Sequence, residues 1–245
     1  MDWEQLSIDI STGNCQALSR AISLVINQYN GYEHLLAGEN DVAITPVIGI
    51  TGPPGAGKST LLDGLISELI RDGHSIAVLC VDPSSPFTHG AILGDRIRMR
   101  GWHDNPRVYI RSLATRGQLG GLPPMIKEII ELVRNGAFDY IFVETVGVGQ
   151  NEIGIASLAD VTVVVLVPEG GDEIQVMKAG LMEIADIFVI NKSDRSGADD
   201  LYNDLKTMNR DKVRSVKVVR TVASSRQGMR ELVSAINSFT EENED

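Results

Sequence analysis

A glycine-rich segment has the composition and spacing of a phosphate-binding loop. It reads Gly52-Pro-Pro-Gly-Ala-Gly57-Lys58-Ser59 and fits the pattern Gly-x-x-x-x-Gly-Lys-Ser/Thr. Glycines let successive backbone N–H groups converge on a phosphate, and a following helix adds the positive end of its dipole. At this spacing the lysine reaches the β- and γ-phosphates, and the serine hydroxyl binds Mg²⁺. The segment therefore predicts a nucleoside triphosphate site made by Gly52, Pro53, Pro54, Gly55, Ala56, Gly57, Lys58, Ser59 and Thr60.

Three acidic residues are candidates for the metal site. Asp82 and Glu144 each end an apolar, strand-like run, and Asp95 lies in the segment ILGDRIRM. Ligands of open α/β sheets bind beyond the carboxyl ends of strands, so Asp82 and Glu144 can converge on the glycine-rich loop. Mg²⁺ prefers a few carboxylates with water and phosphate oxygens, which makes Ser59, Asp82, Asp95 and Glu144 the expected ligands. Asp82 could instead form a turn before the next proline, and Asp95 could pair with neighbouring arginines on a solvated helix face.

A glycine placed three residues after Glu144 suits a phosphate sensor. In the pattern Glu-x-x-Gly, the N–H of Gly147 can point at a γ-phosphate only while that phosphate is present.

The tetrapeptide Asn191-Lys192-Ser193-Asp194 follows an apolar run and predicts a guanine pocket. The Asp194 carboxylate would accept hydrogen bonds from N1–H and the 2-amino group of guanine. Adenine has neither donor and would leave the carboxylate unsatisfied, a mismatch that can reject an analogue by roughly 10⁴-fold. Ala223, after the next predicted strand, is expected to offer its N–H to the guanine O6. GTP is therefore expected in preference to ATP.

These residues are far apart in the sequence, so a sheet must bring them together. The alternation of apolar and amphipathic segments along the chain predicts such a sheet. Short apolar runs alternate with longer amphipathic segments, which indicates a mainly parallel sheet of about seven strands flanked by helices, the three-layer α/β fold of P-loop NTPases. We expect strands at Val47–Thr51, Ile76–Val81, Val108–Ile110, Tyr140–Val143, Val161–Val167, Ile187–Ile190 and Val216–Val219. We expect helices at Lys58–Arg71, Pro124–Asn135, Gln175–Glu183, Ala198–Met208 and Met229–Phe239.

The chain divides into three expected regions. Residues 1–43 form a helical N-terminal extension, in which apolar residues recur at helical spacing after the possible cap Asn14. Residues 44–240 form the nucleotide-binding domain, and residues 241–245 form an acidic, frayed tail.

Charge and cysteine content indicate which partners and which cellular location to expect. A net charge of −11 repels nucleic acid and anionic membranes, so neither is an expected partner. No apolar run reaches the roughly 18 residues of a membrane span, and the N-terminus has no signal-peptide pattern. The two cysteines are far apart, and Cys80 lies in a strand-like run that favours a buried thiol. A reducing cytoplasm is the expected location.

The chain resembles the MeaB/ArgK-type GTPases, the family of the methylmalonic aciduria type A protein. The resemblance runs from about Gly13 to Leu232, and its motifs follow in order: GITGPPGAGKSTL, VDPSSPFTHGAILGDRIRM, ATRGQLGGL, ETVGVGQNE, GGDEIQVMKAGLMEIAD and NKSD. It implies GTP or GDP and Mg²⁺ as cofactors. It also implies a chaperone role for an adenosylcobalamin-dependent acyl-CoA mutase, usually methylmalonyl-CoA mutase, in which GTP hydrolysis gates cofactor loading and protects the mutase. Hydrolysis is expected to be slow without that partner.

The resemblance also assigns catalytic roles beyond Lys58 and Glu144. The segment ETVGVGQNE would be a switch at the mutase interface, and Gly170-Gly171-Asp172-Glu173 a further switch loop. Lys178 is the candidate for stabilising transition-state charge, although it could equally be an exposed helix lysine. Gln150 is a candidate for orienting the attacking water.

Two departures from the family pattern bear on base binding and on assembly. The usual Ser-Ala of the last guanine loop is Val222-Ala223 here, which keeps a backbone donor and loses a hydroxyl. The family's helical C-terminal dimerisation arm has no counterpart after Phe239, so a homodimer would need another surface, or the protein is monomeric until it meets the mutase.

Two other functions remain open on the sequence. A nickel-type metallochaperone GTPase would need clustered soft or imidazole ligands, whereas His34, His74, His89 and His103 are scattered. A kinase of a transport protein would need a protein acceptor for the phosphate, and the sequence does not distinguish such an acceptor from water.

Overall fold

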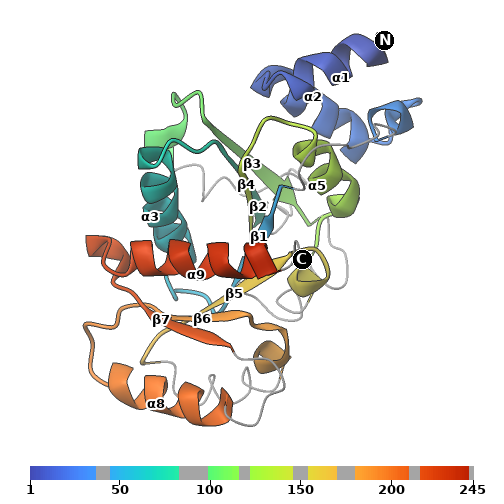
Figure 1. Cartoon of the computed structure of the whole chain (residues 1–245). Helices are drawn as coiled ribbons and strands as arrows, with labels where there is room; N and C mark the ends of the chain where they lie inside the picture. The colour runs from blue at the N-terminus through green and yellow to red at the C-terminus, as the bar shows by residue number, and fades with distance from the viewer. Residues whose placement is uncertain are drawn as a thin grey trace.

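The computed structural model of the chain describes residues 1–36, 45–82, 99–115, 122–145, 154–169, 180–209 and 216–242. Seven strands in these ranges form one sheet in the order β3-β2-β4-β1-β5-β6-β7 (Figure 1), and every neighbouring pair is parallel. The predicted fold class is confirmed. The strands are β1 (Val47–Thr51), β2 (Ile76–Asp82), β3 (Val108–Ala114), β4 (Tyr140–Glu144), β5 (Val161–Leu166), β6 (Ile187–Ile190) and β7 (Lys217–Arg220).

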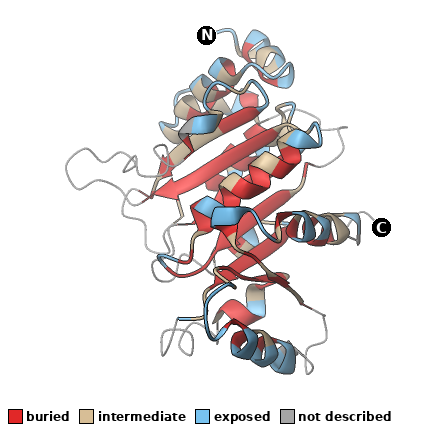
Figure 2. Cartoon of the chain, turned by 90° about the vertical axis from the view of Figure 1, so that its left-hand side faces the viewer, coloured by how far each residue is buried: buried red, intermediate tan, exposed pale blue. Residues whose placement is uncertain are grey.

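The central strands are buried on both faces. Every residue of β1, β2, β4 and β5 is buried, which explains why their sequences are apolar at consecutive positions instead of alternating. The edge strands β3 and β7 have half-buried residues (Figure 2). β3 extends four residues beyond its predicted end at Ile110, because the polar pair Arg111-Ser112 still pairs with the buried strand β2. The sheet therefore has a dry centre and two partly solvated edges.

Helices cover both faces of the sheet. α3 (Lys58–Arg71) and α9 (Met229–Glu242) pack on one face, where Leu61 and Leu232 belong to the same hydrophobic cluster as alternate residues of β1 and β5. On the other face, α5 (Ile126–Arg134) covers the β2–β4 half, and α8 (Ala198–Asn209) covers β5 and β6. α9 continues to Glu242, so its last turn includes two residues that the sequence assigns to the tail.

The N-terminal helices share a hydrophobic cluster with the sheet. α1 (Trp3–Ser11) packs on α2 (Cys15–Ile26), which lies beside α5 (Figure 1). Ile22 and Val25 of α2 are fully buried in one cluster with Leu79 and Leu113 of the sheet. Asn14 caps α2 as expected, because its side chain accepts from the N–H groups of Gln16 and Ala17. In the part of the chain that the structure describes, no helix is long and apolar enough to cross a membrane.

Candidate functional site

The predicted site residues that the structure describes gather at the carboxyl edge of the sheet. All seven strands run in the same direction, so the residues that follow β1, β2, β4 and β6 reach one edge. The glycine-rich loop joins β1 to α3, Asp82 and Glu144 end β2 and β4, and Asn191 directly follows β6. β2 and β4 pair with Cys80 opposite Glu144, which places the two carboxylates on adjacent strands.

Two glycines of the loop are required by close contacts. A Cβ atom on Gly52 would lie 2.1 Å from the carbonyl oxygen of Val165, and one on Gly57 would lie 2.4 Å from Nδ2 of Asn191. Both residues also have positive φ angles, of 133° and 90°. At Gly55, with φ of 74°, an added Cβ would meet no described atom within 4 Å, so this part of the loop faces open space. The two ends of the loop therefore pack against β5 and Asn191, whereas its middle, at Gly55, is accessible.

Lys58 reaches back across the loop that precedes it. Its Nζ donates to the carbonyl oxygens of Gly52 at 2.7 Å and Pro53 at 3.0 Å, and the residue is buried. A buried ammonium needs such acceptors because desolvation of an unpaired charge is costly. The positive charge of Lys58 is thus concentrated inside the loop, where phosphate oxygens can reach it.

Ser59, Asp82 and Glu144 bring buried side-chain oxygens to this edge of the sheet. The Ser59 hydroxyl donates to Glu144 Oε1 at 2.8 Å, and all three residues are no more than 5% exposed. One hydroxyl and two carboxylates suit a hard cation that takes its other ligands from phosphate and water. Within the described residues, no group of three or more His, Cys, Asp or Glu could hold a metal without such help. The ligand set therefore fits Mg²⁺ bound together with a nucleotide.

Asn191 connects the phosphate loop to the loop that follows β7. Its Nδ2 donates to the carbonyl oxygen of Ala56 at 2.8 Å, and its Oδ1 accepts from the N–H of Ala223 at 3.1 Å and the hydroxyl of Thr221 at 3.2 Å. Lys192 adds a second connection, since its Nζ donates to the carbonyl oxygen of Gly55 at 2.9 Å. One fully buried amide therefore sets the separation between the two loops.

The residues predicted to contact the base differ in whether their polar groups already have partners. Asp194 is exposed, and its carboxylate bonds to no described residue. The N–H of Ala223, expected to meet the guanine O6, instead donates to Asn191 Oδ1. The next residue, Ser224, is exposed and lies in the short helix η4 (Ala223–Ser225), and its N–H bonds to no described residue. Ser224 is therefore a further candidate donor to the base, and no sequence motif indicates it.

The loop after β7 is also fastened to the flank of α3. Arg226, with φ of 59°, donates from Nη1 to the hydroxyl of Ser67 at 2.7 Å. On the same helix Asp63 accepts from the indole N–H of Trp102 at 2.7 Å. These contacts join residues far apart in the chain, and no motif indicates them. The helix that begins at Lys58 thus supports the loop on the base side as well.

Four predicted site residues lie outside the described part of the chain. They are Asp95, Gly147, Gln150 and Lys178, and the switch loop at 170–173 lies outside it too. Their roles stay predictions.

Comparisons with known proteins identify relatives of this chain. A relative from Pyrococcus abyssi carries the name of a GTPase. It is 46% identical over 246 residues, which cover 97% of this chain and 76% of the relative. The mitochondrial methylmalonic aciduria type A homolog of Mus musculus is 40% identical over 200 residues, which cover 78% of this chain and 48% of the mouse protein. The crystal structure of a protein named LAO/AO transport system kinase matches with a TM-score of 0.76 and 27% identity, over 98% of this chain and 75% of that one.

The family comparison covers almost the whole chain, including both predicted nucleotide-binding motifs. The model of the methylmalonyl-CoA mutase-associated GTPase MeaB matches residues 18–245. The solved relative shares the P-loop GTPase fold of this chain. The chain therefore belongs to the MeaB family of GTPases, whose members bind guanine nucleotides.

Proposed function

We propose that this GTPase is a chaperone of an adenosylcobalamin-dependent acyl-CoA mutase of the methylmalonyl-CoA mutase type, acting in the cytoplasm. GTP binding and hydrolysis would gate the loading of the mutase cofactor and protect the mutase. The family match names mutase association, and the mouse relative carries the name of a methylmalonic aciduria protein. The structural observation that carries the nucleotide part is the Asn191 side chain, which bonds to Ala56 in the phosphate loop and to Ala223 beside the base loop.

The phosphate groups would bind inside the glycine-rich loop. Lys58, already buried in the loop, would exchange its carbonyl acceptors for oxygens of the β- and γ-phosphates. Backbone N–H groups at the start of α3 would donate to the same phosphates, and the helix dipole favours their negative charge. The phosphates would thereby be held by groups that all come from one continuous segment, Gly52–Thr60.

Ser59, Asp82 and Glu144 are the described residues that would hold Mg²⁺, directly or through water. The ion would supply positive charge to the phosphate oxygens as negative charge develops on the leaving group. To bind it, Ser59 would turn its hydroxyl oxygen toward the ion, while Glu144, its partner at 2.8 Å, would accept from a ligand water. Asp95, Lys178 and Gln150 remain candidates for a further ligand, charge stabilisation and water orientation.

The base would bind between the segments after β6 and β7. Asp194 would accept from N1–H and the 2-amino group of guanine, and Lys192, bonded to Gly55, would cover the ring. We assign the N–H of Ser224 as the donor to the guanine O6, because the N–H of Ala223 already donates to Asn191 Oδ1. The pocket would then recognise three groups that distinguish guanine from adenine.

The decisive experiment measures GTP hydrolysis by the purified protein with and without the acyl-CoA mutase of its own organism. We expect slow hydrolysis alone, stimulation by the mutase of about tenfold or more, and no hydrolysis of ATP. The comparison is made at concentrations where the two proteins elute together in size-exclusion chromatography. Equal hydrolysis rates with and without the mutase would then contradict the chaperone role but not the GTPase activity. Equal hydrolysis of ATP would contradict the guanine pocket.

A phosphotransferase is the second candidate, favoured by the similar solved structure, which is that of a protein named a transport system kinase. With γ-³²P-labelled GTP, hydrolysis releases labelled inorganic phosphate, whereas a kinase leaves the label on a protein acceptor. We expect free phosphate. A metallochaperone gains no support, because the described residues include no group of three or more His, Cys, Asp or Glu that could hold a metal.

A further inference from the structure

The edge strand β7 presents backbone groups that no other strand uses. β7 pairs only with β6, through bonds such as Lys217 N–H to Asp186 O at 3.1 Å and Thr221 N–H to Ile190 O at 2.9 Å. Because successive residues of a strand direct their N–H and C=O groups to opposite sides, those of Val218 and Arg220 point away from the sheet. No described residue bonds to the N–H or C=O of Val218 or to the N–H of Arg220.

The available edge is short. A Cβ on Gly228 would lie 2.1 Å from the carbonyl oxygen of Arg220, so the backbone at Gly228 covers that oxygen. Two N–H donors and one C=O acceptor remain, which is enough for one short added strand. Three backbone bonds contribute little net affinity in water, so a strand that binds here needs additional contacts from side chains.

The side chains around this edge supply positive charge. A hollow of about 650 Å³ opens at β7, and its lining includes Lys206, Lys217 and Arg220 but only one carboxylate, that of Glu231. This local excess of cations contrasts with the net charge of −11 for the whole chain. The hollow therefore favours an acidic ligand.

Aromatic rings hold the three cations at the hollow. Lys206 Nζ lies 4.7 Å and the Arg220 guanidinium 4.2 Å from the centre of the Tyr202 ring, and Lys217 Nζ lies 5.1 Å from that of Phe239. Arg220 also pairs with Asp199 at 2.6 Å, but the Asp199 side chain is 82% exposed. An exposed pair of this kind contributes little stability, so a ligand carboxylate can share the arginine.

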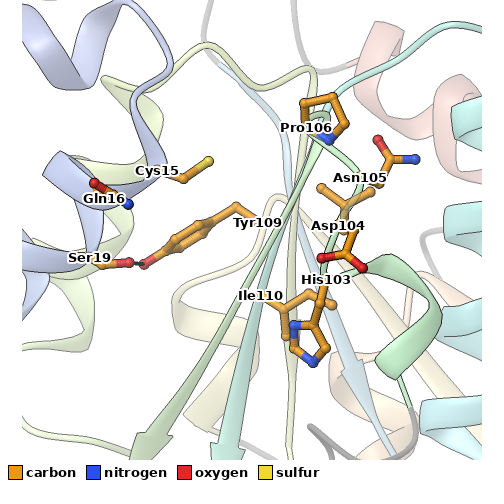
Figure 3. Close-up of a pocket in the computed structure, with 10 residues that line it drawn as sticks. Cys15, Gln16, Ser19, His103, Asp104, Asn105, Pro106, Tyr109 and Ile110 are labelled. Atoms are coloured by element: carbon orange, nitrogen blue, oxygen red, sulfur yellow. Dashed lines mark hydrogen bonds between the residues drawn. The ribbon is translucent and has the colours of Figure 1, made fainter.

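The opposite edge of the sheet provides an internal control (Figure 3). A hollow of about 460 Å³ lies beside β3, where its lining includes Cys15, Gln16 and Asp104 but no described lysine or arginine. Figure 3 shows Tyr109 of β3 directed at Ser19 of α2, with which it shares a hydrogen bond of 3.1 Å. The N–H of Ile110 on β3 bonds to no described residue. Both edges thus offer a strand for pairing, but of the two hollows only the one at β7 is lined by described lysine and arginine residues.

We propose that the β7 edge binds an extended acidic segment of a partner protein, which adds to the sheet beside β7. Its backbone pairs with Val218 and Arg220, while its carboxylates meet Lys206, Lys217 and Arg220. A nucleic acid fits less well, because a phosphodiester has no donor for the Val218 carbonyl and the net charge of the protein repels it. Because ion pairs supply most of the attraction in this contact, we expect the affinity to be low and to fall as the salt concentration rises. The proposal is independent of the nucleotide site.

The test uses the full chain and two fluorescein-labelled peptides, one of alternating valine and glutamate and one of alternating valine and lysine. Fluorescence anisotropy measures affinity, and ¹⁵N-edited NMR follows the amide signals of Val218, Arg220 and Ile110. We expect the glutamate peptide to bind, to shift Val218 and Arg220 more than Ile110, and to lose about tenfold or more in affinity between about 0.05 M and 0.5 M salt. The lysine peptide is expected not to bind.

Two variants separate charge from strand pairing. The double variant Lys206→Glu/Arg220→Glu should lose about tenfold or more in affinity for the glutamate peptide. Val218→Pro, which removes an edge N–H, should also weaken binding, while Ile110→Pro on the β3 edge should leave it unchanged. Thermal unfolding and GDP affinity check that each variant is folded, and the amide shifts of the unaltered protein give the answer even if a proline variant fails.

Three outcomes would overturn the proposal. One is binding of the glutamate peptide without shifts at Val218 and Arg220, or no binding at all. Another is equal binding of the lysine peptide or equal shifts at Ile110, which would mean pairing without charge recognition. The third is a single-stranded DNA oligomer that shifts the same amides and binds more tightly than the peptide, which would assign the hollow to nucleic acid.

Discussion

The phosphate half and the base half of the nucleotide site differ in how far their binding groups are already engaged. In the phosphate half, Lys58 donates to loop carbonyls and Ser59 donates to Glu144, so in the proposed complex Lys58 would exchange protein acceptors for phosphate oxygens. In the base half, the bonds of Asn191 to Ala56 and Ala223 can stay in place, and the Asp194 carboxylate is exposed. In the proposed complex, ligand binding would therefore change existing bonds in the first half and add new ones in the second.

Because of this difference, we expect the phosphate half to provide most of the affinity for the nucleotide and the base half to provide the selectivity for guanine. Exchanging one hydrogen bond for another changes the free energy by little, so the phosphate half gains affinity mainly from charge. Leaving a carboxylate such as Asp194 unsatisfied beneath a base costs much more, so discrimination between bases comes from the other half. Asn191 joins the halves, because the same amide contacts both loops.

Lys58→Ala should have the largest effect. It removes the buried ammonium from the phosphate loop and leaves the carbonyls of Gly52 and Pro53 without this donor. We expect no measurable GTP binding by isothermal titration calorimetry, while Lys127→Ala on the exposed face of α5 binds as the unaltered protein does. Unchanged affinity in a folded Lys58→Ala variant would remove this loop from the phosphate site.

Asp194→Asn should come next and should act on the base half alone. The amide replaces one acceptor by a donor, so the affinity for GTP should fall by about 100-fold. Xanthosine triphosphate, which has a 2-oxo group in place of the 2-amino group, should become the preferred ligand. A competition assay with both nucleotides measures the change, and a retained preference for GTP would exclude Asp194 from the pocket.

Asn191→Ala should affect both halves together. It leaves the carbonyl of Ala56 and the N–H of Ala223 without a side-chain partner, at a cost of about 1–3 kcal/mol. We expect the affinities for GTP and GDP to fall by similar factors, with guanine still preferred over adenine. Asn237→Ala on α9, whose Oδ1 accepts from the Tyr140 hydroxyl, is the control for loss of a structural asparagine. A loss confined to GTP would contradict a role in joining the halves.

Ser59→Ala should affect the phosphate half only when Mg²⁺ is present. The variant loses a metal ligand and the bond to Glu144, so the gain in GTP affinity on adding Mg²⁺ should fall by about tenfold. In excess EDTA the variant and the unaltered protein should bind GDP equally. If Mg²⁺ strengthens GTP binding equally in both proteins, Ser59 is not a ligand.

The smallest expected effect is a change in amide hydrogen exchange at Ser224. Its N–H bonds to no described residue, whereas that of Ala223 is bonded to Asn191. GDP should therefore slow exchange at Ser224 strongly and at Ala223 little, as measured by NMR. The reverse order would restore Ala223 as the donor to O6.

The linear pattern was sufficient to predict the strands and most of the helices that the structure describes. Consecutive apolar residues in β1, β2 and β5 indicated strands buried on both faces, and the spacing from Gly52 to Ser59 indicated a loop that enters a helix. Both signals are local, since backbone geometry and side-chain polarity within a few residues produce them. The order in which the strands pair, and the four-residue extension of β3, were not contained in such local signals.

Other features were decided only by the tertiary structure, because they depend on contacts between distant segments. Asn191 meets Ala56 across 135 residues of chain and takes up the Ala223 N–H, which transfers the O6 contact to Ser224 in our assignment. Arg226 reaches Ser67 across 159 residues, and the cations of the β7 edge come together from α8 and β7. The sequence determined which chemical groups are available, whereas packing determined which of them are already bonded, and only the remaining groups can bind a ligand.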